Sequence, residues 1–515
     1  MSAFFVTAAY FCLFLPFAIF LAGWVRPVIS LPLLAILAVV FFRMAKSQPK
    51  LKYLAPTKDN FLKLLCILSA VGLWVYLAGI GRFAYQNDDH TIRNGIFELL
   101  LRRDWPVVLP PSETSYERPI ALVYYIGFWL PAAAMGKVFG DGIGWLFQLF
   151  WASAEIFLFY VIFCLKFLKK IAVWPIVIFI AFSGLDAVGG RLMGNPDMGI
   201  SSHIEWWVHP FQYSSLTTQL FWVFNQAVPA WLATVLMLIQ KNNRFLVVIA
   251  ALTMITSTIP FLGLIVLGAF VGIYNIFNKC KSQREQFFEM HPIKFLNKSF
   301  SVSDYPEGIR RNLAKGVSFL NALGFTSDNF IAGGLIGIVT FMYMKINEVS
   351  VGFALQQLNP SFFARYLLFF LLEAGVYLFA VYRYQKGTLL YLYSFLGLLA
   401  VPWITIPNSI FNEFCMRASI PFLMVLAFLV IDTFNKSAIK KDYLTIAVLA
   451  ALILLGAGTS GRELSRTIES TIYRGDHGEA IARGSDDPLN EDNMDYFSGE
   501  VEGSEFFNYI AKTLN

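Results

Sequence analysis

Long apolar runs recur along this chain, and they constrain its fold more than any other feature. A helix needs about 20 consecutive apolar residues to cross the hydrocarbon core of a bilayer. Runs near that length lie at residues 3–23, 27–43, 62–81, 143–167, 171–188, 361–382, 387–404 and 418–434. Shorter or interrupted runs lie near 226–240, 244–257, 260–277, 329–345 and 443–457. The sequence therefore predicts an all-α polytopic membrane protein with about 13 transmembrane helices.

The composition supports this class and excludes others. Hydrophobic residues make up 57% of the 515 residues and charged residues only 14%, whereas a soluble protein carries about 25% charged residues. The net charge of +6 comes from short Lys and Arg clusters between the apolar runs, which indicates cytoplasmic loops and no nucleic-acid surface. The five cysteines are scattered, so neither a disulfide framework nor a metal knuckle is indicated.

The basic loops set the orientation of the helices. One assignment of the loops to the two sides of the membrane places all six of the strongest basic clusters in the cytoplasm. It also places the N-terminus inside and Asp88, Asp89 and a tail from about Gly456 outside. This topology requires that the apolar run 119–139 does not cross the membrane, so we expect an interfacial or partly re-entrant helix there. The alternative is an ordinary span that a miscounted helix elsewhere compensates. The six clusters lie at 42–63, 166–170, 241–244, 278–285, 382–387 and 435–441.

This topology divides the chain into a membrane domain and a tail. The transmembrane domain covers residues 1–456, and an extracytoplasmic tail follows at 457–515. Within the domain we expect a first outer loop with interfacial helices at 82–142, a second outer loop at 185–228 and a cytoplasmic amphipathic segment at 279–328. Four of the five histidines fall on the outer side, so the chemistry is expected there.

The first outer loop carries an acidic pair directly before an amphipathic stretch. Asp88, Asp89 and His90 precede residues 92–100, whose apolar positions recur at helical spacing and predict a helix along the membrane interface. One acid can act as a general base with a pKa raised by its neighbour, or the pair can hold a divalent cation. Alternatively, Asp89 merely caps the following helix, which residue physics alone favours although a cap needs only one acid.

The elements around this pair resemble those of the GT-C superfamily of integral-membrane glycosyltransferases. The resemblance covers residues 62–240 best. Two helices precede the helix that leads to the acids, where the superfamily usually has one, so the first hairpin would be an addition. The residues that carry the resemblance are Asn87, Asp88, Asp89 and His90, followed by Trp105-Pro106 and the block YYIGFWLPAAAMGKVFG at 124–140.

The resemblance implies transfer of a sugar from a polyprenyl-phosphate or polyprenyl-pyrophosphate carrier to a glycan, lipid or protein acceptor. The reaction would take place on the extracytoplasmic face of a bacterial inner (plasma) membrane. Members of the superfamily use an acid of the first outer loop as base, a role that falls to Asp88 or Asp89 without a choice between them. The same two acids are the candidate ligands if a cation such as Mg or Mn is needed. The expected partners are the donor, the acceptor and membrane lipids, with no nucleic acid.

A lipid-linked donor also needs groups that hold its phosphate while charge develops. Arg191 and Arg417 are the phosphate candidates, and Arg417 is the stronger because it lies at the mouth of a span; alternatively it extends into lipid headgroups. The HIEWWVHP cluster at 203–210 fits an interfacial or sugar-stacking surface better than a metal site. The predicted substrate-binding residues are His90, Arg191, His203, Glu205, His209, Gln212, Glu413 and Arg417.

Two other functions stay open. A polysaccharide polymerase or ligase also joins lipid-linked sugars on the outer face, and it would need Arg417 and His209 but not the acidic pair. A lipid-linked sugar flippase or transporter would place charged groups near the bilayer midplane, where Glu373 is the one candidate. Pairing of Glu373 with a neighbouring helix is the simpler interpretation.

Overall fold

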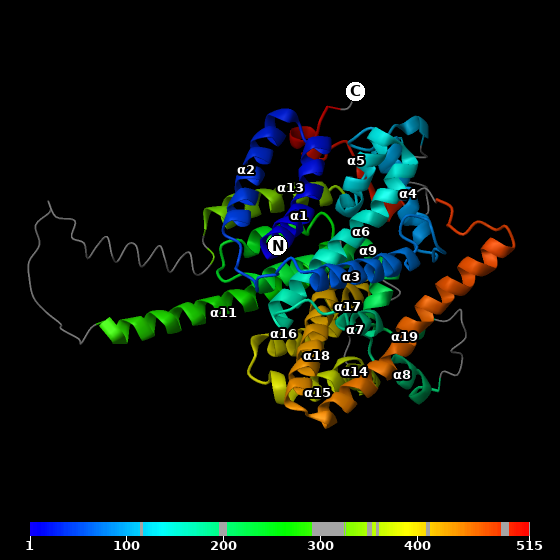
Figure 1. Cartoon of the computed structure of the whole chain (residues 1–515). Helices are drawn as coiled ribbons and strands as arrows, with labels where there is room; N and C mark the ends of the chain where they lie inside the picture. The colour runs from blue at the N-terminus through cyan, green and yellow to red at the C-terminus, as the bar shows by residue number, and fades with distance from the viewer. Residues whose placement is uncertain are drawn as a thin grey trace, which may run out of the picture.

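Helices make up most of the structure, which is a computed structural model (Figure 1). It describes residues 1–113, 117–194, 203–290, 324, 326–347, 353–356, 360–407, 412–485 and 494–513, and of residues 278–290 and 494–495 it describes the backbone alone.

The elements follow in chain order. The α-helices are α1 (Ser2–Trp24), α2 (Pro27–Lys46), α3 (Lys58–Leu77), α4 (His90–Arg102), α5 (Leu130–Phe139), α6 (Asp141–Phe163), α7 (Pro175–Ala181), α8 (Asp186–Leu192), α9 (Leu216–Ile239), α10 (Leu246–Leu252), α11 (Thr258–Met290), α13 (Gly334–Met344), α14 (Pro360–Phe370), α15 (Val376–Gln385), α16 (Leu389–Ala400), α17 (Glu413–Ala418), α18 (Ile420–Lys440), α19 (Tyr443–Asp476) and α20 (Met494–Phe497). The π-helical turns are η3 (Cys164–Leu168), η5 (Asp328–Gly333), η6 (Leu371–Gly375) and η8 (Phe506–Ile510), and the 3-10 turns are η1 (Pro111–Glu113), η2 (Ile126–Trp129), η4 (Ile204–Trp206) and η7 (Val401–Trp403). The strands are β1 (Val108–Leu109), β2 (Ile120–Leu122), β3 (Ala354–Leu355), β4 (Ile404–Thr405) and β5 (Ser498–Glu500).

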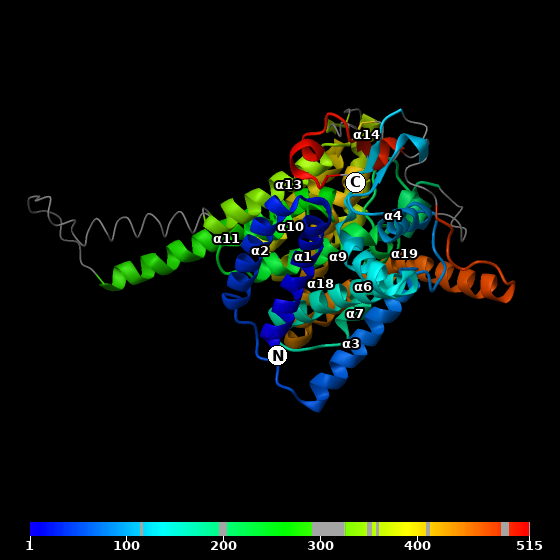
Figure 2. The ribbon, with the colours of Figure 1, turned by 90° about the horizontal axis from the view of Figure 1, so that it is seen from above.

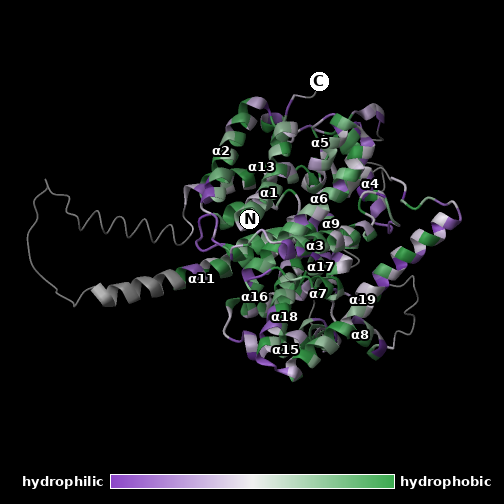
Figure 3. Ribbon diagram, in the orientation of Figure 1, coloured by the Kyte–Doolittle hydropathy of each residue, from purple (hydrophilic) through white to green (hydrophobic). Residues whose placement is uncertain are grey.

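Ten helical stretches of the described chain are long and apolar enough to cross a membrane, so the chain is an integral membrane protein. Figure 3 shows apolar residues, in green, along most of the bundle, and hydrophilic residues, in purple, on the distal part of α19. The membrane class is thus confirmed, but ten is fewer than the expected number of spans. The predicted run 244–257 contains only the seven-residue α10, and the runs 329–345 and 387–404 form shorter apolar helices.

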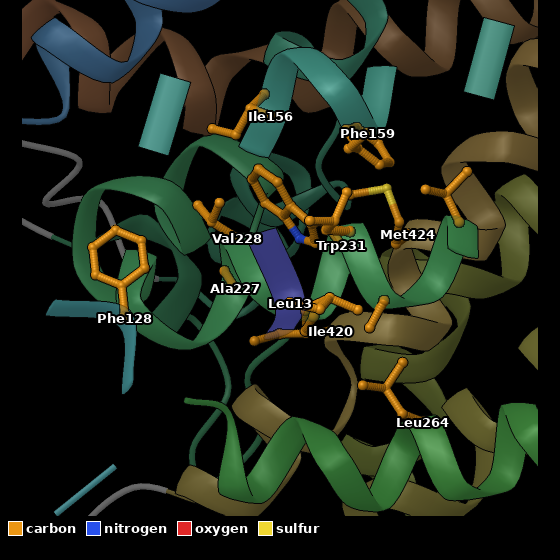
Figure 4. Close-up of a cluster of buried hydrophobic side chains, with 14 of the residues drawn as sticks. Leu13, Phe128, Ile156, Phe159, Ala227, Val228, Trp231, Leu264, Ile420 and Met424 are labelled. Carbon is orange, nitrogen blue, oxygen red and sulfur yellow. The ribbon is translucent and has the colours of Figure 1, made fainter. Parts of the chain in front are cut away.

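Helix α9 lies at the centre of the bundle. Of its most apolar 18 residues, 94% are buried inside the protein, and the helix packs against α6, α11, α18 and α19. Trp231 of α9 lies among Ile156 and Phe159 of α6 and Met424 of α18 (Figure 4). The ring centroids of Trp231 and Phe159 are 6.2 Å apart, a typical separation for packed aromatic side chains. Figures 1 and 2 show α11 and the end of α19 leaving the bundle on opposite sides.

The first outer loop and the C-terminal segment share a small sheet. Strand β2 pairs antiparallel with both β1 and β5, so that Ala121 lies opposite Val108 on one side and Gly499 on the other. Nearby, Nε of Arg26 donates a hydrogen bond of 2.6 Å to the Ala511 carbonyl. The C-terminal segment therefore lies beside the first outer loop.

The predicted boundaries of the second outer loop and of the tail both fall inside helices. Helix α9 already begins at Leu216, although the loop was expected to extend to residue 228. Its first turns carry polar residues that lower the hydropathy of this stretch but are buried in the bundle. Helix α19 runs without a break through Gly456 to Asp476, because Thr459 and Glu463 continue its buried face. Of the predicted segment 279–328, residues up to Met290 extend α11, and most of the remainder lies outside the described residues.

The run 119–139 contains strand β2, turn η2 and helix α5. Its apolar helical part, Ile126–Phe139, is shorter than a membrane span. Gly140 then adopts φ +96°, a conformation that glycine allows, and α6 follows directly. Helix α5 thus packs on α6 as a helical hairpin; that this run does not cross the membrane stays a prediction.

The α5–α6 hairpin closes at facing glycines, and this contact can be tested. A Cβ on Gly136 would lie 2.2 Å from Cδ2 of Leu101 and 3.1 Å from Cα of Gly144. Gly136→Ala should therefore overpack the contact, at a typical cost of about 1–3 kcal/mol, and lower the thermal unfolding midpoint in detergent. Gly142→Ala, which would meet nothing within 4 Å, is the control and should leave the midpoint unchanged. Equal midpoints for the two variants would contradict this packing.

Candidate functional site

Asp88 and Asp89 lie side by side at the start of α4 but face different partners. The Asp88 side chain is 82% exposed and forms an ion pair with Arg483 of the C-terminal segment. The Asp89 side chain is 44% exposed and accepts a hydrogen bond of 2.8 Å from Nη2 of Arg93. The two carboxylates therefore do not act as one unit.

The helix-cap interpretation of Asp89 is wrong. Asp89 occupies the N-cap position of α4, but its side chain makes no capping hydrogen bond. The carboxylate instead binds Arg93, four residues later, at the spacing that brings side chains together on a helix.

Arg417, on the short helix α17, belongs to the same electrostatic environment. It forms an ion pair with Glu413, and its side chain is only 13% exposed. Burial alone would raise the pKa of Asp89, but the charge and hydrogen bond of Arg93, together with the charge of Arg417, hold this pKa below its usual value. Burial also opposes the charge on Arg417, but Glu413 and more distant acids, Asp89 among them, raise the pKa of the guanidinium. The structure thus places the ion pair of Glu413 and Arg417 in the electrostatic environment of Asp89, although Asp89 precedes Glu413 by more than 300 residues.

Two partly buried tyrosines complete this environment. The hydroxyl groups of Tyr124 and Tyr125 contact each other. Burial raises the pKa of both phenols, although the charge of Arg417 opposes the rise. Both phenols therefore stay neutral and can donate hydrogen bonds. We call Asp89, Arg93, Arg417, Tyr124 and Tyr125 the acid–arginine cluster.

Two buried polar atoms at this cluster have no hydrogen-bond partner among the residues described. They are Nη1 of Arg93 and Nε of Arg417. The Arg93 guanidinium also lies 5.7 Å from the ring centroid of Phe224, a cation–π contact. Buried polar groups are nearly always paired with protein, water or ligand. Free guanidinium N–H groups therefore indicate that the cluster can bind an anionic group.

His90 is buried and carries no charge. Its Nδ1 lies 3.0 Å from Oδ1 of Asn87, whose amide nitrogen donates to the Phe221 carbonyl at 2.9 Å. The ring proton is therefore assigned to Nδ1. Burial lowers the pKa of His90 to about 3, and the charge of Arg93 adds to the effect. His90 can position neighbouring groups but supplies no positive charge to a phosphate.

A second polar group gathers around His203 of the second outer loop. The His203 ring nitrogens lie 3.5 Å from a carboxylate oxygen of Glu205 and 3.6 Å from one of Glu463. Nε2 of Gln212 donates to Glu205 at 2.9 Å. Burial alone would lower the pKa of His203, but the two carboxylates raise it to about 9, so the imidazole is protonated at neutral pH. We call His203, Glu205, Gln212 and Glu463 the histidine–glutamate cluster.

Two further acids lie beside each other within the bundle. Asp186 accepts hydrogen bonds from Ser183 at 2.8 Å and Thr459 at 2.7 Å. Nε1 of Trp207 donates to Glu373 at 2.7 Å. Asp186 begins α8 and Glu373 lies in η6, and these two elements pack against each other. Glu373 is thus paired with neighbouring elements, as the simpler interpretation of the sequence expected.

Helix α9 joins the two named clusters. Nε1 of Trp222 donates to Glu463 at 2.8 Å, whereas the ring centroid of Phe224, two residues later, lies 5.7 Å from the Arg93 guanidinium. Between them, Val223 has the non-helical angles φ −135° and ψ 34°. Two nearby side chains of one helix, on either side of this break, thus contact both clusters, so the clusters adjoin.

The remaining predicted site residues do not join either cluster within the described structure. Arg191 is exposed on the last turn of α8. His209 is exposed too, and its carbonyl accepts a hydrogen bond of 2.9 Å from Arg365.

The acidic pair does not fit a Mg or Mn site. Asp88 pairs with Arg483 and Asp89 with Arg93, so their carboxylates do not converge. Among the described residues there is no group of three His, Cys, Asp or Glu side chains that could hold a metal ion.

The sequence interpretation did not include Arg93, Tyr124, Tyr125 or Glu463 in the site. Arg93 carried a usable signal, since it follows Asp89 by four residues on a predicted helix. Glu463 had none, because it was assigned to a tail and reaches His203 only through tertiary packing.

Comparisons with protein-family models, with curated proteins and with solved structures found no match for this chain.

The ion pairs of His203 predict a pH-dependent stability. The folded-state pKa of about 9 lies above the unfolded value of about 6.5. Protonation therefore stabilises the fold fully below pH 6.5, and this contribution is lost as the pH rises through 9. The unfolding midpoint in detergent should fall by several degrees between pH 6.5 and 9.5. In His203→Gln this fall should be markedly smaller, and an unchanged pH profile in that variant would contradict the prediction.

Proposed function

We propose that this chain is a glycosyltransferase of the GT-C type, which moves a sugar from a polyprenyl-phosphate-linked donor to a glycan, lipid or protein acceptor on the extracytoplasmic face. The observation that carries the proposal is the acid–arginine cluster. It combines an accessible carboxylate, Asp89, with the unpartnered N–H groups of Arg93 and Arg417. Such a combination can bind an acceptor hydroxyl and a leaving phosphate at the same time.

In the proposed reaction the acceptor oxygen attacks the anomeric carbon of the donor sugar and forms the new glycosidic bond. The bond from that carbon to the phosphate oxygen breaks, and its electron pair stays on the phosphate. The acceptor proton passes to Asp89. Arg93 and Arg417 stabilise the negative charge that grows on the phosphate, and the neutral phenol of Tyr125 can donate a further hydrogen bond.

The lowered pKa of Asp89 is compatible with this role. The neighbouring arginines make the carboxylate a weak base, but they also keep it ionised at neutral pH. The acceptor hydroxyl becomes acidic only as its oxygen bonds to carbon, so a weak base is sufficient at that stage.

The proposal assigns different roles to the two acids. Asp89 is the catalytic base because, of the two acids, it is the one held beside Arg93, and the charge of Arg417 also acts on it. Asp88 points to Arg483 and anchors the C-terminal segment against the first outer loop.

A proton-coupled transporter of lipid-linked sugars is the second candidate. It is favoured by the buried contact of Asp186 with Glu373, two acids on helical stretches apolar enough to cross a membrane. Buried carboxyl groups of this kind serve as proton relays in transporters. This function gives no reason for the arrangement of Asp89 and Arg417, and so it ranks second.

The first functional test compares the two acids. Asp89→Asn, purified in detergent with an unchanged unfolding midpoint, should lose about 100-fold or more of its transfer activity with a polyprenyl-phosphate-sugar extract. Asp88→Asn is the matched control and should keep most of the activity. If both variants stay active while Arg417→Gln and His209→Ala are inactive, the polymerase or ligase alternative is favoured. If the wild type moves the intact lipid-linked sugar across vesicles without transfer, the transporter is favoured.

A second test separates charge from hydrogen bonding at the phosphate. Arg93→Lys keeps a cation beside Asp89 but removes a donor nitrogen, so kcat should fall about tenfold or more with a smaller change in the KM for acceptor. Arg102→Lys is the control, since Arg102 lies on the same helix with a 63% exposed side chain. An unchanged kcat in Arg93→Lys would show that Arg93 does not act on the leaving group.

A further inference from the structure

An apolar groove lies on the surface of the bundle, away from both polar clusters. It has a volume of about 750 Å³ and is lined by residues of α14, η6, α15, α16 and α19. Its lining carries no polar side-chain atom except the hydroxyls of Tyr382 and Tyr391. Phe379, on its wall, is 84% exposed. The groove is therefore open on a face that an integral membrane protein presents to lipid.

The π-helical turn η6 explains the shape of this groove. The extra residue of a π turn shifts the helix face locally, so Glu373 points inward to Trp207 while Leu371 and Gly375 border the groove. Gly375 has no side chain and Ala380 a small one, which leaves room for a ligand.

The length of the groove corresponds to one leaflet of a bilayer. Phe370 and Tyr382 mark its extent along the helix, and twelve residues of helix rise about 18 Å. One leaflet contributes about 15 Å of hydrocarbon. The rings of Tyr382 and Tyr391 close one end, with centroids 5.8 Å apart. A phospholipid acyl chain fits this length, whereas a polyprenyl chain is far longer than one leaflet.

Positive charge gathers at the tyrosine end of the groove. Nζ of Lys386 lies 6.0 Å from the ring centroid of Tyr382, and Nζ of Lys440 lies 5.2 Å from that of Tyr384. Arg383, nearby, is neutralised by Asp442 at 3.0 Å. Neither lysine has an ion pair among the residues that the structure describes. They are therefore free to meet an anionic headgroup at the membrane surface.

We infer that this groove binds an anionic phospholipid, with an acyl chain between α15, α16 and α19 and the headgroup phosphate at Lys386 and Lys440. The lipid covers the apolar surface of the groove and bridges the inner ends of three helices. The site does not depend on the proposed transferase activity.

Native mass spectrometry of the delipidated full chain tests the inference. Phosphatidylglycerol and phosphatidylcholine with the same acyl chains are titrated separately, and the first should bind at least fivefold more tightly. Lys386→Gln combined with Lys440→Gln should abolish this preference, and the corresponding double Arg variant should restore it. Lys169→Gln combined with Lys170→Gln, in another basic loop, is the control and should keep the preference.

The position of the lipid acyl chain is tested by filling the groove with a larger side chain. Ala380→Phe should weaken binding of both lipids fivefold or more. Leu454→Phe, at a 75% exposed position of α19 outside the groove lining, should bind as the wild type does. The unfolding midpoint checks that each variant is folded. Equal affinity of the wild type for the two lipids, or full binding by Ala380→Phe, would overturn the inference. Neither measurement uses sugar transfer, so their failure leaves the proposed function unaffected.

Discussion

The position of both polar clusters depends on the burial of α9 along its whole length. A helix inside a membrane bundle must satisfy its polar side chains through neighbouring helices, because no solvent reaches them. Near its start this condition is met. Thr217 accepts a hydrogen bond of 3.1 Å from Trp74 of α3, which ties α9 to a neighbouring helix. Gln219 accepts one of 3.0 Å from Trp231, a later residue of α9 itself.

Around the break at Val223, buried polar side chains of α9 lack hydrogen-bond partners among the described residues. The two clusters lie at this break. Asn225 is buried, yet neither of its amide atoms has a partner in the described structure. Trp222 and Phe224, on either side of the break, contact the histidine–glutamate cluster and the acid–arginine cluster respectively. A break in a central helix normally costs stability, since buried backbone and side-chain groups lose their partners. The break lies between the two polar clusters, where our proposal places substrate binding.

The sequence predicted those features that depend on local periodicity and length. The apolar runs gave the membrane class, and the spacing over residues 92–100 gave helix α4. The sequence did not predict those features in which polar residues are buried through tertiary contacts. The polar residues at the start of α9 read as a loop because hydropathy cannot recognise polar groups that neighbouring helices satisfy. The contact of His203 with Glu463 joins segments 260 residues apart, and no local pattern encodes it. By contrast, the ion pair of Asp89 with Arg93 was readable from helical spacing alone.

The different environments of Asp88 and Asp89 follow from their positions at the start of α4. Asp89 is the N-cap residue of the helix, whereas Asp88 precedes it. Asp89 stands four residues before Arg93, the spacing at which side chains meet along a helix. Asp88 turns toward the C-terminal segment and meets Arg483, whereas Asp89 stands above Arg93 on the face of α4. A carboxylate pair at a helix N-terminus is thus better understood as two separate sites than as one. The neighbours that determine the pKa and accessibility of each acid also determine which chemistry it can perform.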